Sequence, residues 1–411
     1  MYNILRNIWP LFFGLFLIAL SVGLQGSLIG IRASAEFDLT ATGLVMTGYF
    51  IGFLIGSTQG ANFIQKVGHV RTFGALTALA SISIIIHAVF VVPWIWFVMR
   101  VITGIAMSGI YVVAESWLNH AATDRNRGQI LSIYMMVIFM GLFFGQFLLN
   151  LADPNTFELF GLISILVSFA AIPILITVTP MPKVEITESV SIKKLFHWTS
   201  FGLIGVFLVN VCDAMIFGMA AVYGTDIGLS IVEISYFVAS FILGGLILQW
   251  PIGHLSDKLD RRLVISVVAG AGTVFAYLCT LQSTDNFLQL LIFTSLLGGT
   301  ILPLYALFIA LINDYMRADK IVAASSTIVL VGGIGAASGP IVTALMMKHF
   351  GSEAFYWGVA VICAIISVYG AIRLLFFKYV REQDRHEFSI YACNAVGAVV
   401  LVEDDKGEEK K

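Results

Sequence analysis

The chain has 411 residues, of which 59% are hydrophobic and 12% are charged, and its mean hydropathy is +0.94. This composition excludes an ordinary water-soluble domain, because apolar surface on this scale needs a lipid solvent. The formal net charge of −2 indicates no particular partner. The lipid bilayer is the expected surrounding, and no nucleic-acid partner is expected.

Twelve apolar segments are each long enough to cross a bilayer, which takes about 20 residues of helix. We therefore predict an all-α membrane protein with 12 transmembrane helices. The first segment is too long for a signal peptide and lacks a small-residue cleavage site, so we expect it to be retained. The predicted spans cover residues 8–31, 42–64, 72–92, 94–119, 129–150, 158–178, 199–223, 230–252, 263–283, 286–313, 321–347 and 354–376.

The cysteines and the ionisable residues give no sign of a metal or cofactor site. Cys212, Cys279 and Cys363 lie in separate apolar segments, and Cys393 lies near the C-terminus. A membrane enzyme would need a cluster of His, Asp and Glu at one depth, and no such cluster stands out in the sequence. We therefore expect no metal, no cofactor and no enzymatic activity.

The lysines and arginines fall almost entirely on one side of the predicted spans. Of the 23, Arg32 and Lys348 lie in loops on one side, Arg100 lies inside a span, and the other 20 lie on the side of both termini. Basic loops of membrane proteins face the cytoplasm. The distribution therefore predicts cytoplasmic N- and C-termini in a plasma membrane, here the bacterial inner membrane.

The longest break between spans, Thr179 to Trp198, divides them into six and six. Landmarks recur in the two halves: Lys66 and Lys258 are 192 residues apart, and the Gly-x-x-x-Gly pairs that begin at Gly141 and Gly335 are 194 apart. Such matching landmarks predict a duplicated six-helix unit. The expected divisions are an N-terminal bundle at 1–182, a cytoplasmic linker at 183–198, a C-terminal bundle at 199–378 and a cytoplasmic tail at 379–411.

A short charged turn lies between two membrane-length apolar runs, at Gln249 to Arg262. It resembles the cytoplasmic signature loop of the major facilitator superfamily, which reads Gly, three residues, Asp, a basic residue, one residue, Gly and two basic residues. Asp260 stands where that family usually has glycine. The resemblance implies the superfamily fold, in which two pseudo-symmetric six-helix bundles surround a central cavity. The matching residues are Gly253, Asp257, Lys258, Arg261 and Arg262.

The corresponding loop of the first half is degenerate. Lys66 and Gly68 match the pattern, but Gln65 stands where the family has aspartate and Val70 stands where it has a basic residue. This departure weakens any ion-pair role for the loop of the N-terminal half.

The resemblance also implies contacts that hold the cytoplasmic side closed and break when it opens. Glu115, near the inner end of the fourth span, is expected to pair with Arg71 or Arg125, and a substrate role is the alternative. Asp314, at the inner end of the tenth span, is expected to pair with one of the two adjacent arginines of the second loop. Asp257 is expected to cap a neighbouring helix N-terminus through its charge.

Ionisable side chains inside a span are costly and therefore indicate function. Arg100 lies in the fourth span and Asp213 in the seventh, and the resemblance implies that spans one, four, seven and ten line the cavity. We hypothesise that Arg100 and Asp213 face each other across it and that Asp213 carries a transported proton. A fixed structural ion pair is the alternative. Weaker polar candidates for substrate contact on these spans are Gln25, Tyr111, Asn210 and Tyr305.

The paired glycines leave flat grooves on the fifth and eleventh spans, where helix backbones can approach closely. The resemblance implies that these helices meet across the pseudo-twofold axis and slide during transport, and static packing is the alternative. Gly339-Pro340 resembles the signature of antiporter branches. In the fifth span Gly145 is followed by Gln146, so the signature is incomplete there.

The fourth and fifth spans resemble a bacterial branch of the superfamily, the YcaD-like one, which implies no settled substrate. We expect a monomeric secondary transporter that moves a small organic solute together with protons, and Arg100 favours an anion or a zwitterion. A multidrug efflux antiporter is the alternative, and a channel or lipid scramblase is less favoured, because alternating access needs two rocking halves. The resemblance to the branch rests on Glu115-Ser116, Arg125-Asn126-Arg127-Gly128, Tyr134, Gly141 and Gly145-Gln146.

Overall fold

The computed structural model describes residues 2–122, 127–176, 191–282, 286–316 and 318–376. Its described residues are almost entirely helical and include no strand. Twelve of the helices are long and apolar enough to cross a membrane, which confirms the predicted number of spans. The predicted tail at 379–411 and the first half of the predicted linker, residues 183–190, lie outside the described residues.

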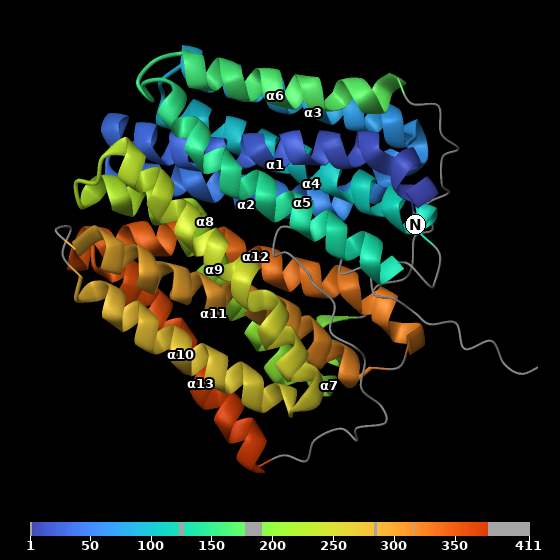
Figure 1. Cartoon of the computed structure of the whole chain (residues 1–411), viewed down its shortest axis with the longest axis vertical. Helices are drawn as coiled ribbons and strands as arrows, with labels where there is room; N and C mark the ends of the chain where they lie inside the picture. The colour runs from blue at the N-terminus through green and yellow to red at the C-terminus, as the bar shows by residue number, and fades with distance from the viewer. Residues whose placement is uncertain (1, 123–126, 177–190, 283–285, 317, 377–411) are drawn as a thin grey trace, which may run out of the picture.

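The helices fall into two successive sets (Figure 1). The short helix α7 lies at the end of the predicted linker, so the spans of the second half are α8 to α13. The first set is α1 (Tyr2–Glu36), α2 (Leu39–Val67), α3 (His69–Val89), α4 (Pro93–Ala121), α5 (Arg127–Phe147), the short 3-10 helix η1 (Leu148–Leu151) and α6 (Glu158–Ile176). The second set is α7 (Ile192–Trp198), α8 (Ser200–Asp226), α9 (Ile231–Lys258), α10 (Arg261–Thr280), α11 (Phe287–Asp314), α12 (Ala318–Phe350) and α13 (Ala354–Phe376).

Helix packing in the second half repeats helix packing in the first half. In the first half α1 packs on α5 and α6, α2 packs on α4, and α3 packs on α4 and α6. In the second half α8 packs on α12 and α13, α9 packs on α11, and α10 packs on α11 and α13. These are the same contacts with every helix number raised by seven, as two copies of one six-helix unit require.

Close helix crossings at glycine show the repeat at the level of single residues. A Cβ on Gly104 of α4 would collide with the carbonyl oxygen of Tyr49 in α2, and a Cβ on Gly298 of α11 would collide with that of Phe241 in α9. The two glycines are 194 residues apart and the two carbonyls are 192 apart, the spacings found in the sequence. Only glycine permits backbones to approach this closely.

The Gly-x-x-x-Gly pairs make close crossings within each half. Gly141 of α5 lies against the carbonyl of Phe16 in α1, and Gly335 of α12 lies against the carbonyl of Phe207 in α8. The glycine faces therefore pack on the first helix of their own half, while the two helices reach the other half elsewhere, α5 against α9 and α12 against α2. The expected sliding across the pseudo-twofold axis stays a prediction. The second glycine of each pair repeats this packing, Gly145 on Leu20 and Gly339 on Val211.

The two halves meet tightly at the end of the bundle where α1 is followed by α2 (left in Figure 1). The Lys348 ammonium of α12 lies 2.9 Å from the Thr40 hydroxyl and 3.8 Å from the Asp38 carboxylate of the other half. Pro340 packs on Gly218 within its own half, and its carbonyl lies against Gly43 of α2. The same end has a hydrogen bond from Asn150 to Ser235 and a ring contact of Phe147 with Tyr236.

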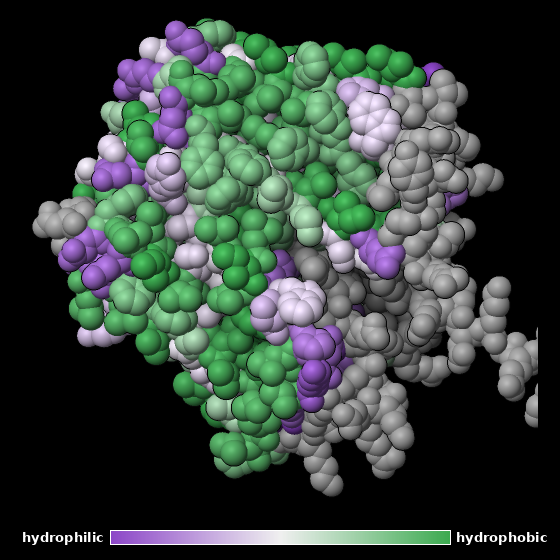
Figure 2. All heavy atoms as spheres, in the orientation of Figure 1, coloured by the Kyte–Doolittle hydropathy of each residue, from purple (hydrophilic) through white to green (hydrophobic). Residues whose placement is uncertain are grey.

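Hydrophobic side chains cover the flanks of the helices, while hydrophilic ones gather towards the helix ends (Figure 2). Large apolar side chains are widely exposed on these flanks, for example Ile82, Ile165 and Val267, each about 60% exposed. In water such a surface would aggregate, whereas in a bilayer it faces lipid tails. The surface therefore agrees with twelve membrane-spanning helices.

Candidate functional site

A pocket between the two halves is lined by three helical stripes of the same spacing. Each stripe places residues at positions i, i+3, i+4 and i+7 of its helix, which form one helix face. Because α2 belongs to the first half and α8 and α12 to the second, the pocket lies where the halves meet. The stripes are Phe50, Phe53, Leu54 and Ser57 of α2, Asn210, Asp213, Ala214 and Phe217 of α8, and Val329, Gly332, Gly333 and Ala336 of α12, joined by Tyr305 of α11.

Asp213 is the one charged residue among the described residues that line this pocket. It is the central residue of α8, about 20 Å from either helix end at 1.5 Å per residue, and its side chain is buried. One turn earlier, the side-chain amide of Asn210 donates to the carbonyl of Val206 at 2.8 Å. Gly332 of α12 packs directly on Asn210, so the absence of a side chain there brings α12 close to this face of α8.

Arg100 is buried but does not line the pocket. Its guanidinium carbon lies 4.6 Å from the ring centroid of Tyr49, a cation–π contact. It forms no ion pair within the described part of the chain, and its Nε has no hydrogen-bond partner there. The Tyr49 ring in turn contacts Phe50 and Phe53, at 5.4 and 6.0 Å between centroids. Arg100 thus contacts a ring next to the pocket wall rather than the pocket itself, and the hypothesis that it faces Asp213 across the cavity stays a prediction.

The helices that line the pocket differ from those expected. The seventh and tenth spans, α8 and α11, contribute as predicted, but the first and fourth spans are replaced by the second and eleventh, α2 and α12. Gln25 and Tyr111 are both buried, but neither is among the lining residues. The Gln25 Nε2 has no hydrogen-bond partner among the described residues, and the Tyr111 ring lies 6.3 Å from Phe53.

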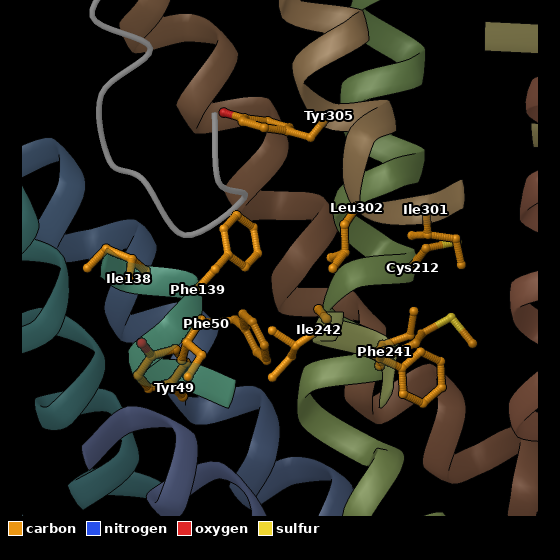
Figure 3. Packing of buried hydrophobic residues seen from close by; sticks show 14 of the residues in the cluster. Tyr49, Phe50, Ile138, Phe139, Cys212, Phe241, Ile242, Ile301, Leu302 and Tyr305 are labelled. Atoms are coloured by element: carbon orange, nitrogen blue, oxygen red, sulfur yellow. The ribbon is translucent and has the colours of Figure 1, made fainter. Parts of the chain in front are cut away.

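The close view in Figure 3 shows how the two halves present aromatic side chains to each other. Phe50 and Phe139 of the first half point towards the region where Leu302 and Tyr305 of the second half lie, while Tyr49 lies behind Phe50. All five side chains are buried. The walls between the halves are therefore largely aromatic and aliphatic.

A buried ion-pair cluster lies at the turn between α9 and α10 of the second half, as the signature loop predicted. The Arg261 guanidinium donates to the Asp314 carboxylate at 2.6 Å, to the Asp257 carboxylate at 2.9 Å and to the carbonyl of Ala310 at 3.1 Å. Both partners of the Arg261–Asp314 pair are buried, which confirms the predicted contact. Burial raises the pKa of Tyr315, the residue after Asp314, although nearby Arg262 opposes this shift.

Asp260 caps the N-terminus of α10, while the cap that Asp257 is expected to give a neighbouring helix stays a prediction. The Asp260 carboxylate accepts from the backbone N–H of Arg262 at 2.9 Å and pairs with its guanidinium at 2.8 Å. Asp260 is the residue that departs from the family pattern, and its place at the N-cap of α10 gives this departure a physical reason. Arg262 also donates to the carbonyl of Arg373 in α13 at 3.1 Å. Of the other signature residues, Gly253 is buried in α9 and Lys258 is exposed.

The corresponding end of the first half, at the turn between α2 and α3, is built differently. Glu115 accepts a hydrogen bond from the Tyr134 hydroxyl at 3.3 Å, while Arg71 is exposed and Arg125 lies outside the described residues. The pairing of Glu115 with either arginine therefore stays a prediction. Lys66 is exposed at the end of α2, and Gly68 has a φ of 88°, a left-handed conformation that glycine adopts readily.

The stripe on α2 that begins with Phe50 and Phe53 was not predicted to line a pocket. The signal available was the spacing itself, since Phe50, Phe53, Leu54 and Ser57 form one helix face and end in a polar residue. The chain has 32 phenylalanines, most of them expected to face lipid, so this pattern did not stand out.

Comparisons with known proteins agree with this architecture. The sequence model of the Major Facilitator Superfamily matches residues 11–212 and 202–390. An uncharacterized MFS-type transporter YcaD of Escherichia fergusonii is 26% identical over 357 residues, which are 85% of this chain and 91% of that one. The relative of the same name from Salmonella arizonae is 25% identical over 361 residues, 86% of this chain and 92% of its own.

Solved structures with the same fold are similar at much lower sequence identity. A nucleoside transporter NupG variant superposes with a TM-score of 0.73 at 11% identity, covering 88% of this chain and 99% of that one. A D-xylose–proton symporter superposes with a TM-score of 0.71 at 12% identity, covering 92% and 99%. A bacterial homologue of the human lysosomal transporter Spinster, in an inward-facing and occupied conformation, gives 0.70 at 14% identity, covering 92% and 97%. At these identities the likeness establishes the fold alone.

Proposed function

The chain belongs to the Major Facilitator Superfamily, and from this premise we propose that it is a proton-coupled secondary transporter of a small organic solute. It acts as a monomer whose two halves rock about the pocket between α2, α8 and α12. Solute binds at the interface of the repeats, and each membrane face has access in turn.

The observation that carries the proposal is the position of Asp213. It is buried at the centre of a membrane helix and on the wall of a pocket shared by both halves. A carboxylate at that depth is costly when charged and much less so when protonated. Proton binding and release at Asp213 is therefore the natural step to couple to movement of the halves.

The closed end of the bundle, where Lys348 contacts Thr40 and Asp38 of the other half, indicates which membrane face the pocket opens to. Lys348 and Arg32 lie at this end, and they are the two loop cations on the side predicted to face away from the cytoplasm. With cytoplasmic termini, the halves are joined at the periplasmic side, so the pocket opens towards the cytoplasm. The cluster of Arg261, Asp257 and Asp314 then lies at the cytoplasmic end. Its pairs join three helices of the second half and are intact beside this opening, so its expected role in the gate stays a prediction.

Flux into proteoliposomes tests the proposal. Purified protein is reconstituted and offered a library of metabolites under an imposed pH gradient, and one or more solutes are expected to accumulate saturably. A protonophore and Asp213→Asn are both expected to abolish accumulation, because each removes the coupled proton. Saturable accumulation that is unaffected by both would contradict the role of Asp213, and flux that does not saturate would indicate a channel.

Efflux of lipophilic compounds is the second candidate, and the aromatic pocket wall favours it. Phe50, Phe53 and Phe217 offer apolar faces to a ligand, as sites for such compounds do. Inside-out vesicles separate import from export, because an exporter loads them when their interior is acidified. Loading under the opposite gradient would identify proton-coupled import.

A further inference from the structure

We infer that the pocket takes an organic cation and that this cation and the proton exclude one another at Asp213, so that transport is an exchange of the two. This inference rests on the proposed function and names the class of its substrate. It replaces the anion or zwitterion that Arg100 favoured in the sequence.

The charge on the pocket wall selects a cation. Asp213 is the charged residue of the lining, and the polar lining side chains near it are Ser57, Asn210 and Tyr305. Their oxygens can all accept hydrogen bonds. An anionic ligand would lie beside the like charge of Asp213 with no basic side chain on the described wall to compensate for it.

The positive charge of Arg100 does not make the pocket favour an anion over a cation. Its guanidinium is held on the ring of Tyr49, and Phe50 and Phe53 separate that ring from the pocket. An anion that reached Arg100 would have to displace this aromatic layer. The positive charge of Arg100 is therefore held on an aromatic ring outside the pocket lining, whereas Asp213 is part of that lining.

The aromatic side chains of the wall fit the same ligand class. Phe50, Phe53, Phe217 and Tyr305 come from both halves and from three helices. Aromatic faces attract organic cations, most strongly where water is excluded. An ammonium group beside Asp213, carrying an apolar or aromatic body packed on these rings, would satisfy both features of the pocket.

Mutual exclusion follows from the presence of one carboxylate. Protonated Asp213 has no charge to offer a cation, and the bound cation stabilises the ionised form. Binding therefore converts the carboxylic acid and a free cation into a carboxylate–cation pair and a released proton. One proton leaves for each cation that binds, so exchange of a monovalent cation for a proton moves no net charge across the membrane.

Proton release from the purified full-length protein tests this inference. The probe is benzyltrimethylammonium, an aromatic cation without a titratable proton, and it is added to weakly buffered protein with a pH indicator. Benzyl alcohol and benzoate serve as the neutral and anionic probes. We expect saturable release of up to one proton per protein with the cation, and none with the other two probes.

Two carboxyl variants locate the released proton. Asp213→Asn is expected to abolish the release, whereas Asp226→Asn is expected to preserve it. Asp226 is the matched control because it ends the same helix, is exposed and accepts a hydrogen bond from Ser352. Phe217→Leu is expected to weaken cation binding several-fold while the number of protons released at saturation stays the same.

The outcomes separate this inference from the proposed function. If benzoate binds and the cation does not, the cation assignment is overturned. The same holds if the cation releases protons equally from the Asp213→Asn protein. Loss of pH-driven flux in Asp213→Asn without any cation binding by the parent protein would leave the proposed function standing and remove the substrate class.

Discussion

His69 occupies, in the first half of the molecule, the place that Arg261 occupies in the second half. The two residues are 192 apart, the spacing that also relates Lys66 to Lys258, and each is the first residue of its helix. Both side chains are buried. The His69 Nε2 lies 3.0 Å from the Ser116 hydroxyl, whereas Arg261 donates to two carboxylates.

The residues next to His69 and Arg261 also differ between the two halves, His120 in the first and Asp314 in the second. His120 and Asp314 are 194 residues apart, the spacing of the glycine pairs. Each lies at the C-terminal end of its helix, and His120 lies close enough to act electrostatically on His69. The ion pair of the second half therefore corresponds to two histidines in the first. The contact in the first half therefore lacks the ion pair that the second half has at the corresponding place.

Installing the missing ion pair should stiffen the first half. We expect His69→Arg combined with His120→Asp to raise stability by about 1 kcal/mol relative to the sum of the single changes, since one partner is exposed. His69→Arg alone should destabilise, because it places a new cation in a buried position. Melting temperatures of the four proteins of the cycle, with hydrogen exchange at the start of α3, provide the measurement. A coupling energy of zero would show that the two positions do not meet.

Breaking the existing pair should be costly. Asp314→Asn leaves Arg261 buried with part of its partners, and loss of one member of a buried pair costs about 3–5 kcal/mol. Asp257 and the carbonyl of Ala310 still accept from Arg261, so we expect the lower end of that range. Thermal unfolding in detergent measures the loss. Lys258→Ala is the control, because this exposed side chain lies in the same loop.

A compensating variant sharpens the same experiment. Arg261→Met with Asp314→Leu removes both charges, and it should recover much of the stability lost in Asp314→Asn. If the double variant also gains flux, the pair restrains opening of the cytoplasmic side. A double variant as unstable as the single one would show that volume and packing, rather than charge, dominate this site.

The N-cap of α10 makes a separate prediction. Asp260→Gly restores the residue that the family usually has, and it removes both the cap to the Arg262 N–H and the ion pair with its guanidinium. We expect a loss of roughly 1 kcal/mol, of which the cap accounts for only a few tenths because glycine is a tolerated N-cap. Asp260→Asn keeps the cap without the charge and should recover part of the loss. Equal melting temperatures for all three proteins would contradict this assignment.

Features that depend on length and spacing could be predicted from the sequence. The number of spans follows from apolar length, and the duplicated unit follows from landmarks such as Lys66 and Lys258. The pairing of Arg261 with Asp314 followed from the family pattern and the helix ends. These features can be predicted without knowing how each helix is rotated about its own axis.

The pocket could not be predicted, because it depends on helix rotation. In a membrane bundle both the lipid face and the protein face of a helix are apolar, so periodicity does not identify the inner face. Phe50 and Phe53 therefore looked like lipid-facing residues. In the same way, Gly141 indicated a close helix partner without saying which one. The contact of Arg100 with the ring of Tyr49, outside the pocket lining, likewise depends on side-chain placement that the spacing does not give.

Locking the closed end of the bundle tests whether the halves must separate there. A Cβ on Gly30 of α1 would lie 3.4 Å from the Cβ of Ala221 in α8, close to the spacing of a disulfide. We expect Gly30→Cys with Ala221→Cys to cross-link on oxidation and to lose flux, because this end can then no longer open. A reductant should restore flux, as a block caused by misfolding would not.

The background and the controls decide how the cross-link is interpreted. Cys212, Cys279 and Cys363 are buried and form no disulfide in the described part of the chain, so they are replaced by Ala or Ser only if the single-cysteine variants react. Each single variant should transport equally in oxidant and in reductant. If the oxidised double variant, shown by mass to be cross-linked, transports as fast as the reduced one, then solute crosses without separation of α1 from α8, and alternating access about this end would be ruled out.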